Sequence, residues 1–325
     1  MRAIVTGGAG FIGSNLVEFL LKKNYEITII DNLTTGNKDN IKDFKNLIKF
    51  IKADISKINS WSKYFKNIDV VFHLAALADI VPSIQKPSAY FNSNVQGTLN
   101  IVNLCRKYKI KKLIYAASSS CYGIPKKFPT KENELISTEY PYALTKRLGE
   151  EIILHWAKVY NLNVKSLRLF NVYGPRSRTS GTYGAVFGVF LAQKLNNKPL
   201  TIVGDGKQTR DFTYVTDVVN AFYIASKKKS SYQIFNVGSG KTISINKIAK
   251  ILGGKKIFLK KRPGEPSCTF ADISLIKREL GWKPKVDINK GINLLLKEIN
   301  YWNKAPIWTK RKINLATKDW FKYLK

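Results

Sequence analysis

The sequence predicts an α/β protein built on a doubly wound parallel sheet, with a smaller C-terminal lobe. The first half of the chain alternates short β-branched runs with helical stretches, the pattern of a parallel sheet covered on both faces. A glycine-rich turn follows the first predicted strand. With 325 residues, of which 44% are hydrophobic, the chain can also bury a large core, which excludes a mainly disordered protein.

The strands of the sheet are predicted from β-branched runs in the first half. They cover Ala3–Thr6, Glu26–Asp31, Ile48–Lys52, Val70–Leu74, Lys112–Ala116 and Val164–Phe170. Apolar residues at helical spacing predict helices at Phe11–Lys22, Ser88–Tyr108 and Pro141–Tyr160. Consecutive strand–helix–strand units of this kind make right-handed crossovers and so build a doubly wound sheet.

The second half looks different, because the alternation gives way to glycine-rich and basic loops after Asn171. We therefore expect a sheet domain at residues 1–170, with later returns near 212–240. Residues 171–325 should form mainly a substrate-binding lobe and C-terminal helices. Three tryptophans near the end, Trp302, Trp308 and Trp320, are expected to pack onto the body or onto a second subunit rather than stack on a ligand.

The charge of the chain is strongly basic, with 55 Lys and Arg against 22 Asp and Glu and a formal net charge of +33. Such an excess suggests a polyanionic partner, nucleic acid above all. Most of these residues are lysines in short groups spread along the chain, whereas arginine is the residue that reads phosphates and guanines with paired hydrogen bonds. We interpret the charge as general composition and expect no specific nucleic-acid partner.

Three cysteines, Cys105, Cys121 and Cys268, are too few and too scattered for a disulfide framework or a metal site. No metal is expected, and a reducing compartment is favoured. The chain opens without the apolar segment of a signal peptide. Its apolar runs stay well short of the roughly 18 residues of a membrane span. These features predict a cytoplasmic protein.

The glycine turn predicts a dinucleotide site. Gly7, Gly10 and Gly13 lie between the first strand and the first helix, where they allow a tight turn, close approach to a pyrophosphate and close helix–strand packing. Asp31 and Asn32 end the next strand, where an acidic side chain can accept from both ribose hydroxyls. Because that carboxylate would repel a 2′-phosphate, NAD is favoured over NADP.

Other strand ends complete the expected cofactor site. Asp54 and Ile55 should cover the adenine, and the turn at Leu74, Ala75 and Ala76 allows close backbone approach. His73 and His155 are interpreted as core histidines rather than catalysts. The cofactor-binding residues expected from the pattern, and from the resemblance described below, are Gly7, Gly10, Phe11, Ile12, Gly13, Asp31, Asn32, Asp54, Ile55, Leu74, Ala75, Ala76, Asn94, Tyr142, Lys146 and Phe170.

A tyrosine and a lysine four residues apart, Tyr142 and Lys146, are the candidate catalytic pair. The spacing puts both on one face of the predicted helix. It occurs four times in the sequence, so spacing alone proves little. Only this pair also follows a strand that ends in a hydroxyl cluster, Ser118-Ser119-Ser120.

Taken together, these features resemble the extended short-chain dehydrogenase/reductases, and within them the nucleotide-sugar epimerases and dehydratases. Further matching segments are Arg168 to Pro175, Gly204 to Phe212, Phe235 to Gly238 and Arg262 to Glu265. The resemblance covers most of the chain and implies an NAD-binding Rossmann domain. It assigns catalysis to Ser118, Tyr142 and Lys146.

The chemistry that these residues support is alcohol oxidation by hydride transfer. Tyr142, as phenolate, takes a proton from a sugar hydroxyl while Ser118 hydrogen-bonds the same oxygen. A free phenol has a pKa of about 10, so positive charge must lower it for work at pH 7. Lys146 and the oxidised nicotinamide are expected to supply that charge.

The resemblance also narrows the reaction. Relatives that eliminate water carry an Asp-Glu pair where this chain has Ser119 and Ser120. Sugar-acid decarboxylases carry Glu at the second of these places. In 3,5-epimerising relatives a Cys stands two residues before the position of Tyr122, whereas Cys121 stands one residue before it. What is left is C4 epimerisation through a transient 4-keto sugar. A reductase or dehydratase on the same scaffold is the alternative.

Substrate anchors are implied by the same matches. Asn171, Arg210 and Arg262 match positions that bind the diphosphate in 4-epimerases, and two guanidinium groups suit a pyrophosphate. Asp211 is expected to be an internal salt-bridge partner. The expected substrate-binding residues are Ser119, Ser120, Asn171, Arg210, Arg262, Glu265 and Thr269.

Two features bear on the sugar. Thr269 replaces the bulky Tyr of epimerases restricted to unsubstituted hexoses, so a UDP-hexose or a UDP-N-acetylhexosamine fits. Against the latter, Arg176 and Arg178 could pair with a C6 carboxylate, which would make the substrate a UDP-uronic acid. The stretch Arg176 to Phe190 departs most from common epimerases.

The resemblance also implies a homodimer, in which the helices Ser88–Tyr108 and Pro141–Tyr160 pair with their copies in a four-helix interface. The apolar side chains Ile152, Ile153, Trp156 and Val159 agree with that arrangement, although one face of each helix must also cover the sheet.

Overall fold

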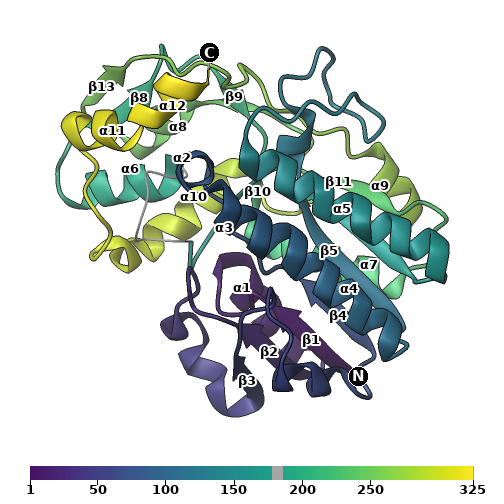
Figure 1. The fold of residues 1–325 in the computed structure, drawn as a ribbon. Coiled ribbons are helices and arrows are strands. Elements are labelled where there is room, and N and C mark those ends of the chain that lie inside the picture. Colours follow the sequence, from purple (N-terminus) through teal and green to yellow (C-terminus); the bar gives the residue numbers. More distant parts are fainter. Residues whose placement is uncertain (178–185, 325) are drawn as a thin grey trace.

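A seven-stranded parallel sheet organises the molecule in the computed structural model, which describes residues 1–177 and 186–324 (Figure 1). Its strands lie in the order β11-β6-β5-β4-β1-β2-β3, so the chain starts in the middle and winds out to both edges. The predicted doubly wound fold is confirmed. The strands are β1 (Arg2–Thr6), β2 (Glu26–Asp31), β3 (Ile48–Lys52), β4 (Val70–His73), β5 (Lys112–Ser118), β6 (Val164–Leu169) and β11 (Ile234–Val237).

Helices cover both faces of this sheet, because each face is apolar. On one face lie α1 (Phe11–Leu21) and α7 (Val215–Lys227), whose buried side chains join those of the strands in one hydrophobic cluster. On the other face lie α4 (Gly97–Lys107) and α5 (Pro141–Tyr160), side by side in Figure 1, over a second cluster. The strand β11 comes from far along the chain and pairs with β6 at the edge.

One predicted helix is not continuous. The stretch expected to be helical over Ser88–Tyr108 consists of α3 (Pro87–Phe91), a π-helical turn at Asn92–Gln96 and then α4. The π turn widens the helix at the point where the buried Asn94 reaches the loop after β4 and a side chain of α5. Periodicity cannot reveal such a turn, because one wider turn leaves the apolar spacing on either side intact.

A third hydrophobic cluster forms the core of the smaller lobe, at the upper left of Figure 1. Short strand pairs replace the large sheet there, namely β7 with β10, β8 with β13, and β9 with β12. These strands are β7 (Asn171–Tyr173), β8 (Leu200–Val203), β9 (Thr209–Arg210), β10 (Phe212–Tyr214), β12 (Ile243–Ser244) and β13 (Lys256–Leu259). The helices of the second half are α6 (Val186–Leu195), α8 (Ile245–Leu252), α9 (Ser274–Leu280), α10 (Ile288–Lys297), α11 (Lys310–Ala316) and α12 (Lys318–Tyr323). Of these, α9 packs against the large sheet through Ile276 and Leu280.

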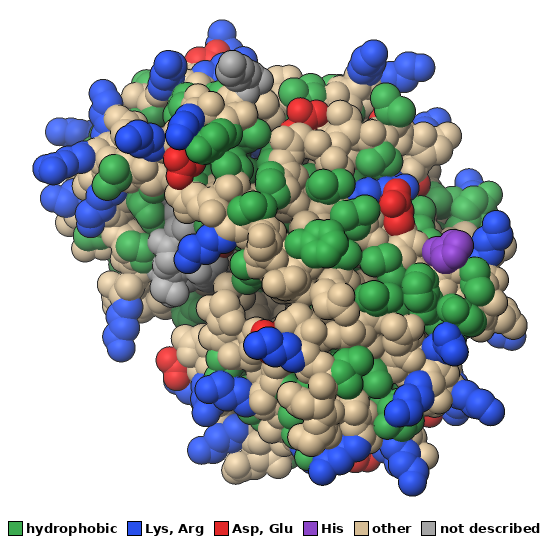
Figure 2. Space-filling model, viewed as in Figure 1, with side chains coloured by type: hydrophobic (Ala, Val, Ile, Leu, Met, Phe, Trp, Pro, Cys, Tyr) green, Lys and Arg blue, Asp and Glu red, His purple; other side chains and the backbone are tan. Residues whose placement is uncertain are grey.

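Smaller elements complete the chain. They are α2 (Ile80–Gln85) and the 3-10 turns Lys38–Leu47, Ser60–Phe65, Ser119–Tyr122 and Ile299–Trp302. Within the described ranges, no helix is long and apolar enough to cross a membrane. On the face shown in Figure 2, Lys and Arg side chains are scattered around the whole outline, while hydrophobic side chains gather over α4 and α5.

Candidate active site

A cavity of about 370 Å³ lies at the carboxyl ends of β1, β2 and β4. Most of the predicted cofactor-binding residues line it. These are Gly7, Gly10, Phe11, Ile12, Gly13, Asp31, Asn32, Asp54, Ile55, Leu74, Ala75 and Ala76. The sequence reasoning missed the loop Thr34–Gly36, which also lines the cavity and could have been recognised from its glycine five residues after the strand-end acid Asp31.

The glycine turn fits a dinucleotide because the backbone is packed there without room for side chains. Gly7 has a φ of +70°, and a Cβ atom on it would lie 2.7 Å from the backbone nitrogen of Ala75. A Cβ atom on Gly13 would lie 2.1 Å from the carbonyl oxygen of Gly7. Strand, turn and helix therefore approach closely, and the N-terminus of α1 opens onto the cavity, where its free N–H groups suit a pyrophosphate.

Asp31 is held in place from both sides. Its two carboxylate oxygens accept hydrogen bonds from the backbone N–H groups of Ala9 (3.0 Å) and Leu33 (2.8 Å). Burial raises the pKa of Asp31, and these N–H groups act against that rise. A Cβ atom on Gly36 would lie 2.8 Å from the same carboxylate, so only glycine lets the loop close over it. The arrangement aims a fixed acceptor into the cavity, as a ribose hydroxyl pair needs.

Asn94 supports the cofactor cavity from behind. It is 1% exposed, and its amide exchanges two hydrogen bonds with the backbone of Leu77 and donates a third to the Thr145 hydroxyl. These bonds position the loop after β4. Its predicted contact with the cofactor stays a prediction.

The two histidines have different fates. His73 is fully buried between the hydroxyls of Thr6 (2.7 Å) and Thr98 (2.9 Å), and burial lowers its pKa to about 3. The interpretation as a core histidine is confirmed for His73. It is wrong for His155, which is exposed on the outer face of α5. The error arises because two apolar faces of that helix, one inner and one outer, look alike in sequence.

A second cavity of about 470 Å³ adjoins the first and shares Ala78, Asp79, Val172 and Phe187 with it. The predicted residues that line it are Ser118, Ser119, Ser120, Tyr142, Phe170, Asn171, Arg210, Arg262, Glu265 and Thr269. Residues from strands far apart in the sequence thus meet around one space. The sequence reasoning missed Tyr140 and Trp320 as lining residues, because isolated aromatic residues carry no motif.

The hydroxyl groups expected to catalyse lie on one wall of this cavity. Ser118 is the last residue of β5, and its Oγ lies 2.8 Å from Oγ of Ser120. Tyr142 stands in the first turn of α5, where Pro141 fits because the first helical N–H groups need no partner within the helix. Burial raises the pKa of Tyr142, while a hydrogen bond with Ser118 acts in the opposite direction.

Lys146 lies one helical turn further along α5 and is only 4% exposed. Its Nζ sits 4.1 Å from the centre of the Tyr115 ring, a cation–π contact with a residue of β5. Burial lowers the pKa of Lys146 to about 7, against the charge of Glu150. The amine is therefore poised between its two charge states near neutral pH.

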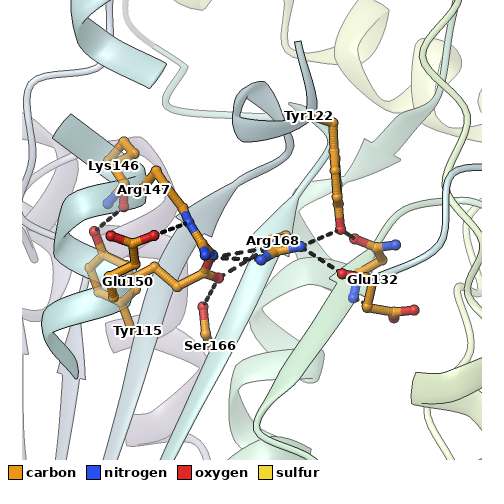
Figure 3. A network of polar contacts seen from close by, with 10 residues as sticks. Tyr115, Tyr122, Glu132, Lys146, Arg147, Glu150, Ser166 and Arg168 are labelled. Carbon is orange, nitrogen blue, oxygen red and sulfur yellow. Dashed lines mark hydrogen bonds and ion pairs between the residues drawn. The ribbon is translucent and has the colours of Figure 1, made fainter. Parts of the chain in front are cut away.

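A buried ionic network lies behind this helix (Figure 3). Glu150 is 1% exposed and receives hydrogen bonds from Arg168 (2.8 Å), Arg147 (2.7 Å) and Ser166 (2.6 Å). Burial alone would raise the pKa of Glu150, but its contacts with Arg168 hold it below the ordinary value. Arg168 continues the network to the hydroxyl of Tyr122 at 2.8 Å. The network ties α5 to β6 and so fixes where Tyr142 and Lys146 lie relative to the sheet.

In the wall of the second cavity, charged side chains from strand β9 and from the turn Arg262–Glu265 meet. The Glu265 carboxylate accepts from Arg210 Nη2 at 3.0 Å and lies 3.8 Å from Arg262 Nη1. The Thr269 hydroxyl donates to Asn171 Oδ1 at 2.9 Å. The two predicted diphosphate anchors are thus brought to one carboxylate, although they are 52 residues apart in sequence.

Two sequence interpretations are corrected here. Asp211 forms no salt bridge with any residue that the structure describes: its carboxylate accepts from the backbone of Ser239, Gly240 and Ala271 and from the Ser239 hydroxyl, and so holds that loop. Arg176 does not face a sugar carboxylate, because its Nη2 lies 2.6 Å from Glu18 on α1. Arg178 lies outside the described residues.

Comparison with known proteins agrees with this geometry. The NAD dependent epimerase/dehydratase family model matches residues 3–238. The chain belongs to this family. It is therefore an NAD-dependent enzyme, and NAD is its cofactor.

Three similar proteins illustrate the family. A putative UDP-glucose 4-epimerase of Methanocaldococcus jannaschii is 40% identical over 93% of this chain and 98% of its own. The structure of a UDP-N-acetylglucosamine 4-epimerase from Methanobrevibacter ruminantium has a TM-score of 0.85 and 33% identity, covering 91% of this chain and 98% of its own. A UDP-glucuronic acid 4-epimerase of Bacillus cereus, solved with UDP-glucuronic acid and NAD, has a TM-score of 0.85 and 34% identity over 94% and 99%.

Proposed function

We propose that this protein is an NAD-dependent 4-epimerase of UDP-hexoses or UDP-N-acetylhexosamines. One observation carries the proposal. Ser118 and Tyr142 line the second cavity, which adjoins the first, and the two places next to Ser118 are filled by Ser119 and Ser120 instead of carboxylates. Elimination and decarboxylation need an acid or a base at those places, whereas C4 epimerisation needs only a group that moves the proton of the C4 hydroxyl.

Each side chain has a defined part in this reaction. Bound NAD supplies a hydride acceptor and a positive charge. Tyr142 removes the proton of the C4 hydroxyl and returns it after the sugar has turned over, and Ser118 hydrogen-bonds the same oxygen. Arg210 and Arg262 bind the diphosphate, so the substrate stays attached while its sugar rotates. The buried position of Lys146 favours a short-range electrostatic effect on Tyr142.

Two features favour a neutral sugar over a uronic acid. Thr269 is a small residue in the cavity wall, which leaves space for a 2-acetamido group. Arg176, one of the two arginines that suggested a carboxylate at C6, is engaged with Glu18 instead. We therefore place UDP-uronic acid 4-epimerisation second.

The assembly that we propose is a homodimer through a four-helix interface. Phe91, Leu144, Val159 and Tyr160 are each more than two-fifths exposed and lie on α3 and α5. Such an exposed apolar face favours a partner surface. Ile153, expected to face the partner, instead packs into the core at 0% exposure. Sedimentation equilibrium tests the proposal, and a monomer at micromolar concentration would contradict it.

Along the chain we propose that residues 1–170, with returns near 212–240, bind NAD and that residues 171–325 mainly bind the UDP-sugar. Part of the first segment also lines the second cavity, through Ser118, Ser119 and Ser120. We place the protein in the cytoplasm, because Cys105, Cys121 and Cys268 are all free thiols. Cell fractionation checks this location.

The deciding experiment is a substrate panel. The purified protein is incubated without added NAD with UDP-hexoses, UDP-N-acetylhexosamines and UDP-uronic acids, and products are identified by proton NMR. We expect interconversion of a C4 pair of neutral sugars. Tyr142→Phe, which lacks only the hydroxyl, is the control and should lose roughly a hundredfold or more in rate. Conversion of uronic acids alone would favour the second candidate, and no conversion of any pair would defeat the proposal.

A further inference from the structure

Trp320, on the short helix α12, lines the substrate cavity although it lies almost at the end of the chain. It is 4% exposed. Figure 1 shows α12, in yellow, beside the strands β8 and β13 of the smaller lobe, and this helix also packs against α2 of the first half of the chain. The side chain therefore reaches the cavity from the last helix of the chain.

The contacts of Trp320 are with the segment that carries the diphosphate anchor. Its indole Nε1 donates to the carbonyl oxygen of Pro263 at 2.7 Å. The guanidinium carbon of Arg262 lies 5.1 Å from the centre of the indole ring, within the range of a cation–π contact. The same side chain thus holds both the backbone and the charged group of the turn Arg262–Glu265.

A comparison with the other buried tryptophans separates this role from plain core packing. Trp61, Trp282 and Trp302 each belong to one of the three hydrophobic clusters. Among the described residues, Trp320 belongs to none of the three core clusters. Its ring instead faces the guanidinium group of Arg262. The ring centre of Tyr140, which also lines the cavity, lies 6.5 Å from that of Trp320.

The contact of Arg262 with Glu265 is long enough for the arginine to turn toward a ligand. Its Nη1 lies 3.8 Å from Glu265, whose carboxylate is more closely paired with Arg210 at 3.0 Å. An arginine side chain loses considerable rotamer freedom when it is fixed, and a planar ring against the guanidinium group reduces that loss on ligand binding.

We propose that Trp320 is a substrate-positioning residue, which seats the Arg262 guanidinium against the indole ring so that it binds the diphosphate of the UDP-sugar. This inference rests on the proposed function, because it assumes that the second cavity binds a nucleoside diphosphate sugar. Trp320 touches Arg262 rather than the reacting atoms and so acts on binding, not on the chemical step.

Two substitutions and a control test this role. Trp320→Leu fills most of the space without an aromatic face, Trp320→Phe keeps a ring but loses the N–H group, and Tyr323→Ala removes an exposed ring from the same helix. UDP binding is measured by calorimetry, and KM and kcat are measured with the best substrate. For Trp320→Leu we expect the Kd of UDP and the KM to rise roughly tenfold, with kcat and bound NAD little changed.

Trp320→Phe should stay within about threefold of the wild type, because the ring over the guanidinium group is kept. Tyr323→Ala should bind UDP as the wild type does. Unchanged UDP binding in Trp320→Leu would overturn the inference. An equal loss in Trp320→Leu and Trp320→Phe would also overturn it, because the ring over Arg262 would then not be the cause.

A double-mutant cycle distinguishes seating of Arg262 from general loosening. In an Arg262→Ala background, Trp320→Leu should change the Kd of UDP by no more than about twofold, because its target is gone. A full tenfold effect in that background would refute the inference. Failure of the proposed function looks different: the wild type itself would then neither bind UDP nor interconvert any sugar pair.

Discussion

The catalytic helix and the diphosphate end of the substrate cavity use charged side chains in opposite ways. Behind α5, Glu150 and Arg168 are almost completely buried, at 1% and 2% exposure, and hydrogen bonds tie them to each other and to neighbours such as Ser166 of β6. In the wall of the substrate cavity, the Glu265 side chain is 24% exposed and meets Arg210 of β9 and Arg262 of its own turn.

This difference separates what the protein must keep fixed from what it exchanges. A buried pair with all hydrogen bonds made cannot open without a large cost, so it suits the positioning of Tyr142 and Lys146. The Glu265 carboxylate, by contrast, is partly exposed to water, and a ligand diphosphate offers the same negative charge, so Arg210 and Arg262 can leave Glu265 for the ligand. A buried ion pair thus holds the reacting groups in place. The diphosphate is recognised by arginines whose ion pairs with Glu265 can be exchanged for the ligand.

The largest expected effect compares the two carboxylates directly. Glu150→Gln should lower the free energy of unfolding by about 3–5 kcal/mol, because it leaves the buried Arg168 without its counter-charge. Glu265→Gln, the matched change at the cavity, should cost about 1 kcal/mol or less. Urea denaturation of both variants measures the two values. Similar losses in both would remove the contrast between the two regions.

The stabilisation that Glu150 provides should depend on pH. Because the pKa of Glu150 is held below its ordinary value of 4.5, its stabilisation is fully present above that pH. The stabilisation is lost as the pH falls through the lowered value. The stability difference between wild type and Glu150→Gln should therefore shrink in acid. A difference that grows in acid would contradict this assignment.

A second, smaller effect concerns the charge of Lys146. Lys146→Met should reduce kcat by roughly tenfold to a hundredfold at pH 7, since a lost cation disfavours the Tyr142 phenolate and raises its pKa. The pKa of Lys146 is about 7, so the wild type loses the same charge as the pH rises. The ratio of the two rates should narrow between pH 7 and pH 9. A constant ratio would mean that Lys146 only fills space.

The smallest expected effect concerns Thr269, in the wall of the substrate cavity. Thr269→Tyr should reduce the preference for N-acetylated over plain sugars by roughly tenfold, because the ring occupies the space for the acetamido group. Competition between the two substrates, followed by NMR, measures the preference. Thr269→Val is the matched control, since it loses the hydrogen bond to Asn171 but not the space. An equal shift in both variants would assign the effect to the hydrogen bond.

The sequence predicted the sheet and the first cavity well for a physical reason. Parallel strands bring their carboxyl ends to one edge of the sheet, so residues that end strands, such as Asp31 and Ser118, must lie along that edge, where the two adjoining cavities open. Their position follows from local patterns alone. Periodicity also placed α5, whose apolar inner face repeats along its whole length.

The same reasoning failed where a partner comes from a distant part of the chain. Arg176 meets Glu18, and Asp211 meets the loop at Ser239, through loops whose paths no periodicity encodes. Trp320 was expected to pack on the body, which it does, but its place in the cavity wall depends on where α12 crosses the smaller lobe. Exposure of His155 depends on which of two apolar helix faces covers the sheet.

The hydrogen bonds of Asn94 also bear on how the site opens to solvent. Its single amide group bonds the backbone of Leu77, in the cofactor cavity wall, and the Thr145 hydroxyl, between the two catalytic residues of α5. Each segment loses hydrogen bonds to this same buried side chain when it opens to water, so Asn94 couples the two openings. The amide hydrogens of both should therefore exchange with solvent at one shared rate, even before NAD or substrate binds. A mixture of half-formed sites is then avoided, because the floor of the cofactor cavity and the catalytic helix open and close as one unit.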